Sequence, residues 1–491
     1  MCALRLLRKK NHAKSPGRHR ILHAPSFWAE YQSYWGQSNV ASELRHKVLL
    51  VIGIGSSLYD HGDDGAVQCN IGTVHQWIFD AETWLSGPLE KDRLGMAGLQ
   101  VYCLAILARQ IFSIGGDTVW VSIGSLVHRA MQMGLHRDPK HLPPMPVLQA
   151  ELRRRLWATI LDLVVQSSLD ASMPPRISLD ENDTEPPANV NDDDMDESTA
   201  KLLPQPRDTF TSTSAQLALL QSLPIRLRIV ESLNNLRSEL SYPTALSLTS
   251  QLCSALQDHD NLFNTAPFQR SHLDYLTRRF IIPMHYRFSH AASTNPLFQS
   301  SVKLSLDAAL ALIGPSQSDG DGDGDDNPFG RLLVIGGGLY REGLRCATTA
   351  ITLALLSHLE TQRGDGSLHR APQYRRFLMQ VARDLVGLAE RRIRHGETNV
   401  KSHFFLSIVL AQVEAVEQGR EVEVEVARAA RDSLEFCEGL LAARAEGMGA
   451  NDLPSHAESL ADDDAIFGQG GDLQFGSDFD CGIFSANGYL D

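Results

Sequence analysis

Residues 117–139 read Asp117-Thr-Val-Trp-Val-Ser-Ile-Gly-Ser-Leu-Val-His-Arg-Ala-Met-Gln-Met-Gly-Leu-His-Arg-Asp-Pro139. The apolar side chains in this stretch recur at the three- and four-residue spacing that lines one face of an amphipathic helix. Asp117 suits the N-cap position, while Gly134 and Pro139 are residue types that end helices. The stretch therefore predicts a helix with a defined start and a defined stop.

The same periodicity continues through most of the chain. A second helix is predicted over residues 147–171, with Leu148, Leu152, Leu156, Ile160 and Leu163 on one face. Alternating strand patterns are scarce, so the sequence predicts an all-α fold, a multi-helix bundle. Further helices are predicted over residues 72–86, 93–113, 212–240, 244–263, 270–292, 300–313, 339–360, 373–395, 400–417 and 420–447.

Changes in composition divide the chain into three parts. Residues 1–20 carry seven Lys or Arg and no acid, which predicts a disordered basic arm. Residues 21–447 form the predicted helical body, with flexible insertions near residues 173–211 and 314–330, where Pro, Gly and acidic residues concentrate. Residues 448–491 form a tail of acidic and aromatic residues.

The overall charge excludes some classes of protein. The chain has 45 Lys and Arg against 59 Asp and Glu, a net charge of −14, which argues against a protein that wraps nucleic acid with its whole surface. Most of this acid lies outside the predicted helices, with nine acids in residues 180–198, five in 319–326 and nine in 451–491. The helical body is therefore close to neutral.

Cysteine usage and hydropathy set the expected compartment. The seven cysteines are widely spaced and include no CxxC pair, which is not the pattern of a disulfide framework or a zinc module. No apolar run reaches the ~18 residues that a membrane helix needs, and the N-terminus lacks the apolar core of a secretory signal. We expect a soluble intracellular protein that does not enter a membrane.

The sequence predicts no catalytic, metal or cofactor site. Gly53 and Gly55 match the first two glycines of a dinucleotide-binding motif, but Leu58 stands at the third position and no strand–helix alternation follows. Residues 48–58 therefore predict a buried helix, and an oxidoreductase is the least favoured function. The Asp-Gly repeat from Asp319 to Gly324 copies only the first half of a calcium loop.

The stretch Glu151-Leu-Arg-Arg-Arg-Leu-Trp157 concentrates charge on one predicted helix. Glu151 and Arg155 are four residues apart, which allows an ion pair worth about 0.2–0.5 kcal/mol on a solvated helix face. Arg153, Arg154 and Arg155 project over about 200° of the helix circumference, so they do not form one phosphate-binding surface. A structural role is predicted for this charged stretch.

Three segments together resemble the fungal-specific transcription factor domain, the regulatory region found behind zinc binuclear cluster DNA-binding domains. The first is Ile21-Leu-His-Ala-Pro-Ser-Phe27, followed by Glu30-Tyr31 and Tyr34-Trp35. The most recognisable one runs from Gly134-Leu-His-Arg-Asp-Pro139 through Glu151–Trp157 and Asp162 to Met173-Pro-Pro-Arg-Ile177 and Pro186-Pro-Ala-Asn189. The last is Asn399-Val-Lys-Ser-His-Phe404.

This resemblance spans about residues 20–420. It implies an all-helical body without catalytic residues, which regulates an attached DNA reader in response to metabolites or partners. It also implies a structural signature made of His136, Arg137, Asp138, Pro139, Glu151, Arg153, Arg154, Arg155 and Trp157.

The sequence departs from the family's pattern at the DNA reader. In that family six cysteines hold two zinc ions, in a pattern that begins Cys-x2-Cys, whereas Cys2 is the only cysteine before Cys69 here. Zinc thiolate ligands are obligatory for that module to fold. Either the protein regulates transcription without its own reader, or the N-terminus is truncated relative to a longer product.

The basic arm contains Arg5, Arg8, Lys9, Lys10, Lys14, Arg18 and Arg20. Such a cluster is typical of a nuclear import signal or of an arm that contacts phosphates, with Arg5, Arg8, Lys9, Lys10 and Lys14 as the candidate residues. A solvated tail without function and a mitochondrial presequence are the alternatives. The import signal is favoured and predicts a nuclear location.

The tail interleaves acids with aromatic residues, of which Phe467, Phe475, Phe479 and Phe484 are the candidates for activation. Acidic–aromatic alternation is typical of disordered activation segments, in which the acids keep the aromatic rings solvated until they dock on a coactivator. The alternative is a solubilising tail.

Together these patterns predict a fungal transcription regulator, an activator that controls a biosynthetic cluster of secondary-metabolite genes. The expected partners are the transcription machinery or a coactivator, with DNA reached indirectly or through a partner DNA-binding protein, and a homodimer is one assembly to test. The alternative is a helical ligand-binding or scaffold protein without transcriptional output.

Overall fold

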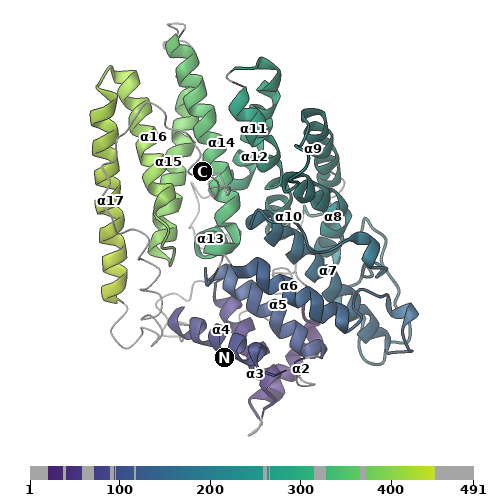
Figure 1. The fold of residues 1–491 in the computed structure, drawn as a ribbon. Coiled ribbons are helices and arrows are strands. Elements are labelled where there is room, and N and C mark those ends of the chain that lie inside the picture. The colour runs from purple at the N-terminus through teal and green to yellow at the C-terminus, as the bar shows by residue number, and fades with distance from the viewer. Residues whose placement is uncertain are drawn as a thin grey trace. The chain divides into compact units, whose positions relative to one another are not determined.

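The computed structural model describes residues 20–36, 40–57, 71–88, 93, 95–115, 118–257, 262–264, 266–292, 294–314, 328–364 and 372–447. Within these ranges the chain forms helices α2 to α17 and a few short 3-10 helices, and it forms no β-strand (Figure 1). The prediction of an all-α, multi-helix fold is therefore confirmed.

The N-terminal helices pack in sequence order. They are α2 (Ala24–Tyr34), α3 (Ser42–Ser56), α4 (Ile71–Ser86), α5 (Met96–Ile111), α6 (Val119–Gln132) and α7 (Val147–Asp170), and α3, α5, α6 and α7 each contact the next. The predicted buried helix with two glycines is α3. A Cβ atom on Gly53 would lie 2.9 Å from Cγ1 of Val74, so this glycine allows α4 to approach closely.

The middle of the chain forms α8 (Ser214–Leu233), α9 (Tyr242–Gln257), α10 (Pro267–Arg278), α11 (Ile281–Ala291) and α12 (Gln299–Ile313). The single helix predicted over residues 270–292 is wrong, because the chain breaks between α10 and α11. Pro283 explains the break: proline has no amide hydrogen, and its ring clashes with the carbonyl four residues earlier, at Arg279.

The C-terminal helices are α13 (Pro328–Ile335), α14 (Gly337–Gly364), α15 (Pro372–Arg394), α16 (Lys401–Gln418) and α17 (Val422–Gly447). The long helix α14 contacts α5, α11, α12, α15 and α16 and so connects the C-terminal helices with earlier parts of the chain. Helix α13 was not predicted. The predicted insertion near residues 314–330 lies mostly outside the described residues, and its last three residues belong to α13.

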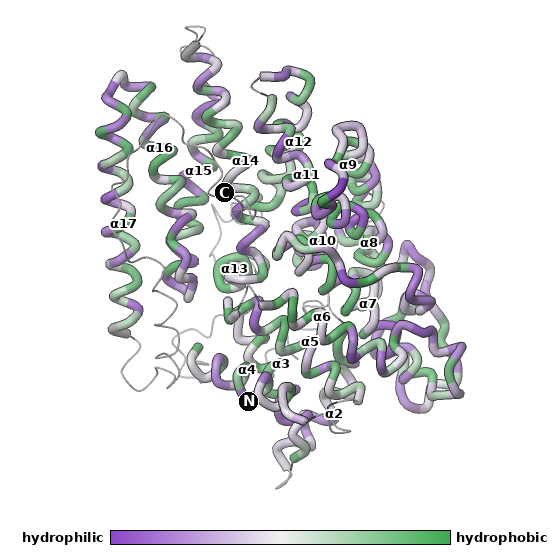
Figure 2. The backbone as a smooth tube through the Cα atoms, in the orientation of Figure 1, coloured by the Kyte–Doolittle hydropathy of each residue, from purple (hydrophilic) through white to green (hydrophobic). Residues whose placement is uncertain are grey.

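One apolar core extends from Ile21 to Val413 through α3 to α16. Two smaller clusters lie beside it, one formed by Phe27, Tyr31 and Val48 and one formed by Leu148, Val190 and Met195. Figure 2 shows apolar and polar residues alternating along the helices, as expected for elements that bury only one face. The described residues up to Arg444 form one compact unit.

The segment that links α7 to α8 is anchored to the body over residues 183–195. It is extended, as the proline content predicts, with two 3-10 helices, η3 (Leu179–Glu181) and η4 (Asp192–Asp194). The sequence predicted a flexible insertion here, but Val190, Asp192 and Met195 are buried against the body, and hydrogen bonds tie the segment to α7. Figure 2 shows many hydrophilic residues in this segment, and this composition is what predicts a flexible insertion from sequence alone.

None of the described helices is both long enough and apolar enough to span a membrane.

Candidate functional site

Helix α7 carries most of the signature residues and is buried over almost all of its length. Glu151 and Arg155 have no exposed surface, and the Trp157 side chain is only 1% exposed. The i,i+4 ion pair predicted between Glu151 and Arg155 is present, with Nε of Arg155 3.1 Å from Oε1 of Glu151. The expectation that this pair lies on a solvated face is wrong, because the segment after α7 folds back over it.

Arg155 is the centre of a buried polar cluster. Its Nη1 donates to Oδ1 of Asp192 at 2.6 Å, and its Nη2 donates to Oγ1 of Thr213 at 3.0 Å. Asp192 also accepts a hydrogen bond from the guanidinium of Arg20. We call Arg20, Glu151, Arg155, Asp192 and Thr213 the Asp192 node. Two arginines and two carboxylates balance its charge, as burial of ionised groups requires.

Asp192 also holds the start of the described chain in place. Its Oδ2 accepts from the amide of Ala24 at 2.9 Å, and its backbone carbonyl lies 2.9 Å from Nε2 of His23. Burial alone would raise the pKa of Asp192, but Arg20 and Arg155 outweigh burial and lower it below the usual value. The carboxylate is therefore ionised at neutral pH and joins three parts of the chain.

A second cluster forms around Asp138, in the motif that follows α6. The side chain of Asp138 is fully buried, and its two oxygens accept from Nε and Nη2 of Arg154 at 2.8 and 2.9 Å. Amides of Lys140 and Glu185 donate to the same carboxylate, each at 3.0 Å. Burial would raise the pKa of Asp138, but these hydrogen bonds overcome burial and hold the pKa well below its ordinary range.

The structure brings the motif at 134–139 together with residues 183–185, which directly precede the motif at 186–189, although the bonded residues lie 45 to 47 positions apart in the sequence. The amide of Asp183 donates to the carbonyl of His136 at 3.0 Å, and the amide of Asp138 donates to Oδ1 of Asp183 at 2.8 Å. Further along the segment, the amide of Ala188 donates to Oε1 of Glu151 at 3.1 Å. Both clusters therefore fix the same segment to α7.

The remaining signature residues take separate positions. Nη2 of Arg153 donates to the carbonyl of Met133 at 2.8 Å, so the three adjacent arginines do reach three different partners. Arg137 is exposed and pairs with Asp183 at 3.4 Å. Pro139 is buried in the 3-10 helix η2 (Pro139–His141), and the ring of His136 lies 6.4 Å from that of Trp157.

The two residues that complete the node are not among the predicted site residues. Asp192 lies in the acid-rich stretch that the sequence predicts to be a flexible insertion, and Thr213 belongs to no motif. The sequence does hold one indication of this arrangement, the motif Pro186-Pro-Ala-Asn189. The side chain of Asn189 forms hydrogen bonds with later residues of the same segment. Its Nδ2 donates to the carbonyl of Pro206 at 2.7 Å, and its Oδ1 accepts from Oγ1 of Thr211 at 2.6 Å.

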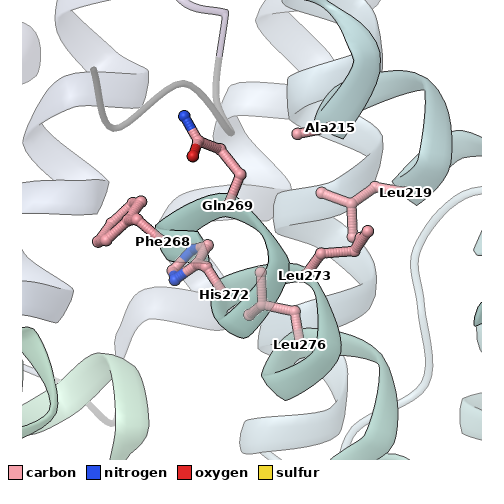
Figure 3. Close-up of a pocket in the computed structure, with 7 residues that line it drawn as sticks. All are labelled: Ala215, Leu219, Phe268, Gln269, His272, Leu273 and Leu276. Atoms are coloured by element: carbon pink, nitrogen blue, oxygen red, sulfur yellow. The ribbon is translucent and has the colours of Figure 1, made fainter. Parts of the chain in front are cut away.

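The described residues offer little room for a small molecule at the hollow shown in Figure 3. That hollow lies between α8 and α10, is lined mainly by apolar side chains and has space for about one water molecule. Its one hydrogen-bonded ring, His272, is already 2.8 Å from the hydroxyl of Tyr340. Among the described residues, no three His, Cys, Asp or Glu side chains are grouped to hold a metal ion.

The candidate activation and import residues cannot be placed. Phe467, Phe475, Phe479 and Phe484 lie outside the described residues, as do Arg5, Arg8, Lys9, Lys10 and Lys14. Of the basic arm, only Arg20 is described.

Comparison with known proteins assigns a family to the first half of the chain. Residues 17–262 match the fungal specific transcription factor domain, a range that includes the Asp192 node and the Asp138 cluster. No solved structure shows a significant match to the chain.

Curated relatives agree with this match. The chain is 52% identical over 466 residues to Transcription factor asR3 of Sarocladium schorii, covering 87% of this chain and 55% of that protein. It is 33% identical over 483 residues to Transcription factor opdR of Penicillium oxalicum, covering 91% and 60%. It is 29% identical over 428 residues to the Aspyridones cluster regulator apdR of Emericella nidulans, covering 83% and 57%.

The chain thus spans somewhat more than half the length of these relatives. The family match covers half of the chain and includes every residue of the predicted signature. The chain belongs to the fungal specific transcription factor domain family.

Proposed function

We propose that this chain is the regulatory part of a fungal transcription regulator that activates a cluster of secondary-metabolite genes. The observation that carries the proposal is the family match over residues 17–262, which coincides with the buried signature around α7. The similarity to a protein named as the Aspyridones cluster regulator supports a biosynthetic cluster as the target.

In this proposal the helical body is regulatory and performs no catalysis. The ionisable groups of the Asp192 node and of the Asp138 cluster are buried and occupied by one another, so they are not available to a substrate. What they do is fix a long acidic segment and the start of the body against α7. The proposal assigns nuclear import to the basic arm and recruitment of the transcription machinery to the acidic tail.

The tail is proposed to recruit a coactivator or the transcription machinery. The test fuses residues 1–491 to a heterologous DNA-binding domain and measures a reporter, with and without Phe467, Phe475, Phe479 and Phe484 changed to Ala. Loss of the aromatic rings should remove most of the activity, because these rings supply the apolar contacts of a docking segment. Replacing Ser455, Ser459, Ser477 and Ser485 by Ala is the matched control, since it changes four tail residues without removing a ring.

A reporter that stays silent with the wild-type chain would favour the alternative of a ligand-binding or scaffold protein. A reporter that is active but unaffected by the four Phe changes would remove the tail from the proposal.

The basic arm is proposed to direct the chain to the nucleus. A fluorescent fusion should be nuclear, and changing Arg5, Arg8, Lys9, Lys10 and Lys14 to Ala should leave it in the cytoplasm. The matched control changes exposed basic residues of the body, Lys201, Arg207, Arg237, Arg376 and Arg431, to Ala. Mitochondrial fluorescence of the wild type, or nuclear fluorescence of the arm variant, would contradict this role.

A further inference from the structure

Helix α17 differs from the helices beside it because it buries very little of its own surface. Over residues 422–445 only Ser433 and Cys437 are buried, whereas Val424, Leu434 and Phe436 are 47%, 51% and 40% exposed. The main apolar core includes residues of α15 and α16 but none of the described residues of α17. Because a helix in a protein gains most of its stability by packing an apolar face, α17 is weakly stabilised.

Polar contacts attach α17 to the two helices that lie beside it in Figure 1, α15 and α16. Oγ of Ser433, in the middle of α17, lies 2.7 Å from Nδ1 of His403 on α16. Nearer the end of the helix, Nη1 of Arg444 donates to the carbonyls of Ile393 and Glu397 at 2.7 and 2.8 Å. These contacts join α17 to the end of α15 and to the start of α16.

We propose that α17 is a latch, a helix that undocks from α15 and α16 as a unit while the rest of the body stays folded. Two observations support this together. The described part of α17 lacks the apolar burial that holds the other helices in place. The contacts that do attach it are hydrogen bonds, which water can replace at a small net cost when the helix opens.

The state of the latch would decide which apolar residues of α17 another protein can reach. In the docked state Cys437 is buried and Leu440 and Leu441 are half-buried, with the exposed acids Glu435 and Glu438 beside them. Undocking would make all three apolar side chains accessible on one amphipathic helix, the kind of element that binds in an apolar groove. The undocking itself does not depend on the proposed activation function and is tested without a partner.

Two buried cysteines of the full chain provide a direct test. Cys437 on α17 is 1% exposed, and Cys103 on α5 is fully buried within the main core. Burial also raises the pKa of both thiols, so neither reacts with iodoacetamide until the helix that carries it opens. Under native conditions we expect Cys437 to be modified at least about 100-fold faster than Cys103, with each site followed by mass spectrometry.

Two substitutions should weaken the latch and leave α5 unchanged. Ser433→Ala removes the hydrogen bond to His403, and Arg444→Met removes the bonds to the two carbonyls while keeping the aliphatic part of the side chain. Each should speed the modification of Cys437 about three- to ten-fold and leave that of Cys103 unchanged. Glu435→Gln, at an exposed position on the same helix, is the matched control and should behave as the wild type.

Hydrogen exchange of the backbone amides tests whether the whole helix opens. We expect amides in both halves of α17 to exchange together, at least about ten-fold faster than those of α16. Equal modification rates of Cys437 and Cys103 in the wild type, or faster exchange confined to the part of α17 after Cys437, would overturn the proposal. So would an equal increase at both cysteines in the Arg444→Met variant, because this contact would then stabilise the body as a whole.

Discussion

Asp192 connects more distant parts of the chain than any other residue described above. Its carboxylate and carbonyl bind Arg20, His23, Ala24 and Arg155, so it joins the start of the body to α7. Removing one partner of a buried ion pair leaves an uncompensated charge, which costs far more than the net value of the pair itself. The residue is therefore a sensitive point for stability.

We predict that Asp192→Asn lowers the free energy of unfolding by roughly 3 kcal/mol. Asparagine keeps the shape of the side chain but removes its charge, so Arg20 and Arg155 share Glu151 as their only carboxylate in the node. Urea unfolding of the full chain measures the loss. Asp193→Asn is the control, because Asp193 is the exposed neighbour and should change stability by less than about 0.5 kcal/mol. Equal effects of the two substitutions would contradict the prediction.

His285 is the second buried residue with a measurable consequence. It is fully buried, its Nε2 lies 2.8 Å from Oγ1 of Thr249, and its Nδ1 lies 2.9 Å from Oγ of Ser301. These contacts join α9, α11 and α12. Burial lowers the pKa of His285 to about 4 from an ordinary value of 6.5. The folded protein therefore holds this imidazole neutral.

The shift predicts how stability depends on pH. Because the pKa is lower in the folded state, the contribution of His285 is complete above pH 6.5 and is lost progressively as the pH falls toward 4. From pH 7.5 to pH 5 the loss should be about 2 kcal/mol. His285→Gln should remove that part of the pH dependence, whereas His290→Gln, at an exposed position on the same helix, should leave it in place. Unfolding in urea at the two pH values provides the comparison.

At the scale of the helices, periodicity predicted most elements because a helix buries a stripe of its own residues. Helix α7 begins at Val147 as predicted and ends one residue early, at Asp170. The errors occur where one residue interrupts a helix that the apolar pattern alone would continue, as Pro283 does between α10 and α11. The Asp192 node could not be predicted in the same way, because bonded members such as Arg20 and Asp192 are 172 residues apart and meet only after folding.

Helix α14 shows a close approach that depends on a missing side chain. A Cβ atom on Gly343 would lie 2.2 Å from the hydroxyl oxygen of Tyr275 and 2.8 Å from Cζ of the same ring. Tyr275 is itself fixed, since it is 1% exposed and its hydroxyl donates to the carbonyl of Tyr340 at 2.9 Å. The ring of Tyr275 therefore has little freedom to move away from a larger residue at position 343.

We predict that Gly343→Ala destabilises the protein by about 1–3 kcal/mol, the usual cost of adding a methyl group to a packed core. The same substitution at Gly439 should have the opposite sign. Gly439 lies inside α17 with no atom within 4 Å of the added Cβ, so alanine gains helix propensity worth about 0.5–1 kcal/mol. Thermal unfolding of both variants tests the pair, and two changes of the same sign would contradict it.

For the molecule as a whole, the structure shows where part of the net charge of −14 lies, which composition alone could not do. Nine of the acids lie in residues 180–198, a segment that binds α7 through the carboxylate of Asp192 and the amide of Ala188, and binds Asp138 through the carboxylate of Asp183 and the amide of Glu185. The same segment binds residues 20–24. The beginning of the body is therefore held in place by a part of the chain about 170 residues later.

This long-range tie predicts how the body responds to truncation. Removing residues 1–19 should change the free energy of unfolding by less than about 0.5 kcal/mol, because Arg20, His23 and Ala24 keep their contacts with Asp192. Removing residues 1–24 deletes all three contacts and leaves Asp192 and Arg155 without their third partner, so we expect a loss of about 2–4 kcal/mol.

The cause of that loss can be separated from a general effect of shortening the chain. In the Asp192→Asn background the contacts are already weakened, so the longer truncation should cost at least about 1 kcal/mol less than it does in the wild type, as expected for groups that share partners. Urea unfolding of the four proteins completes this double-mutant cycle. Additive losses would show that residues 20–24 stabilise the body through apolar contacts near Phe27. Their contribution would then be independent of Asp192.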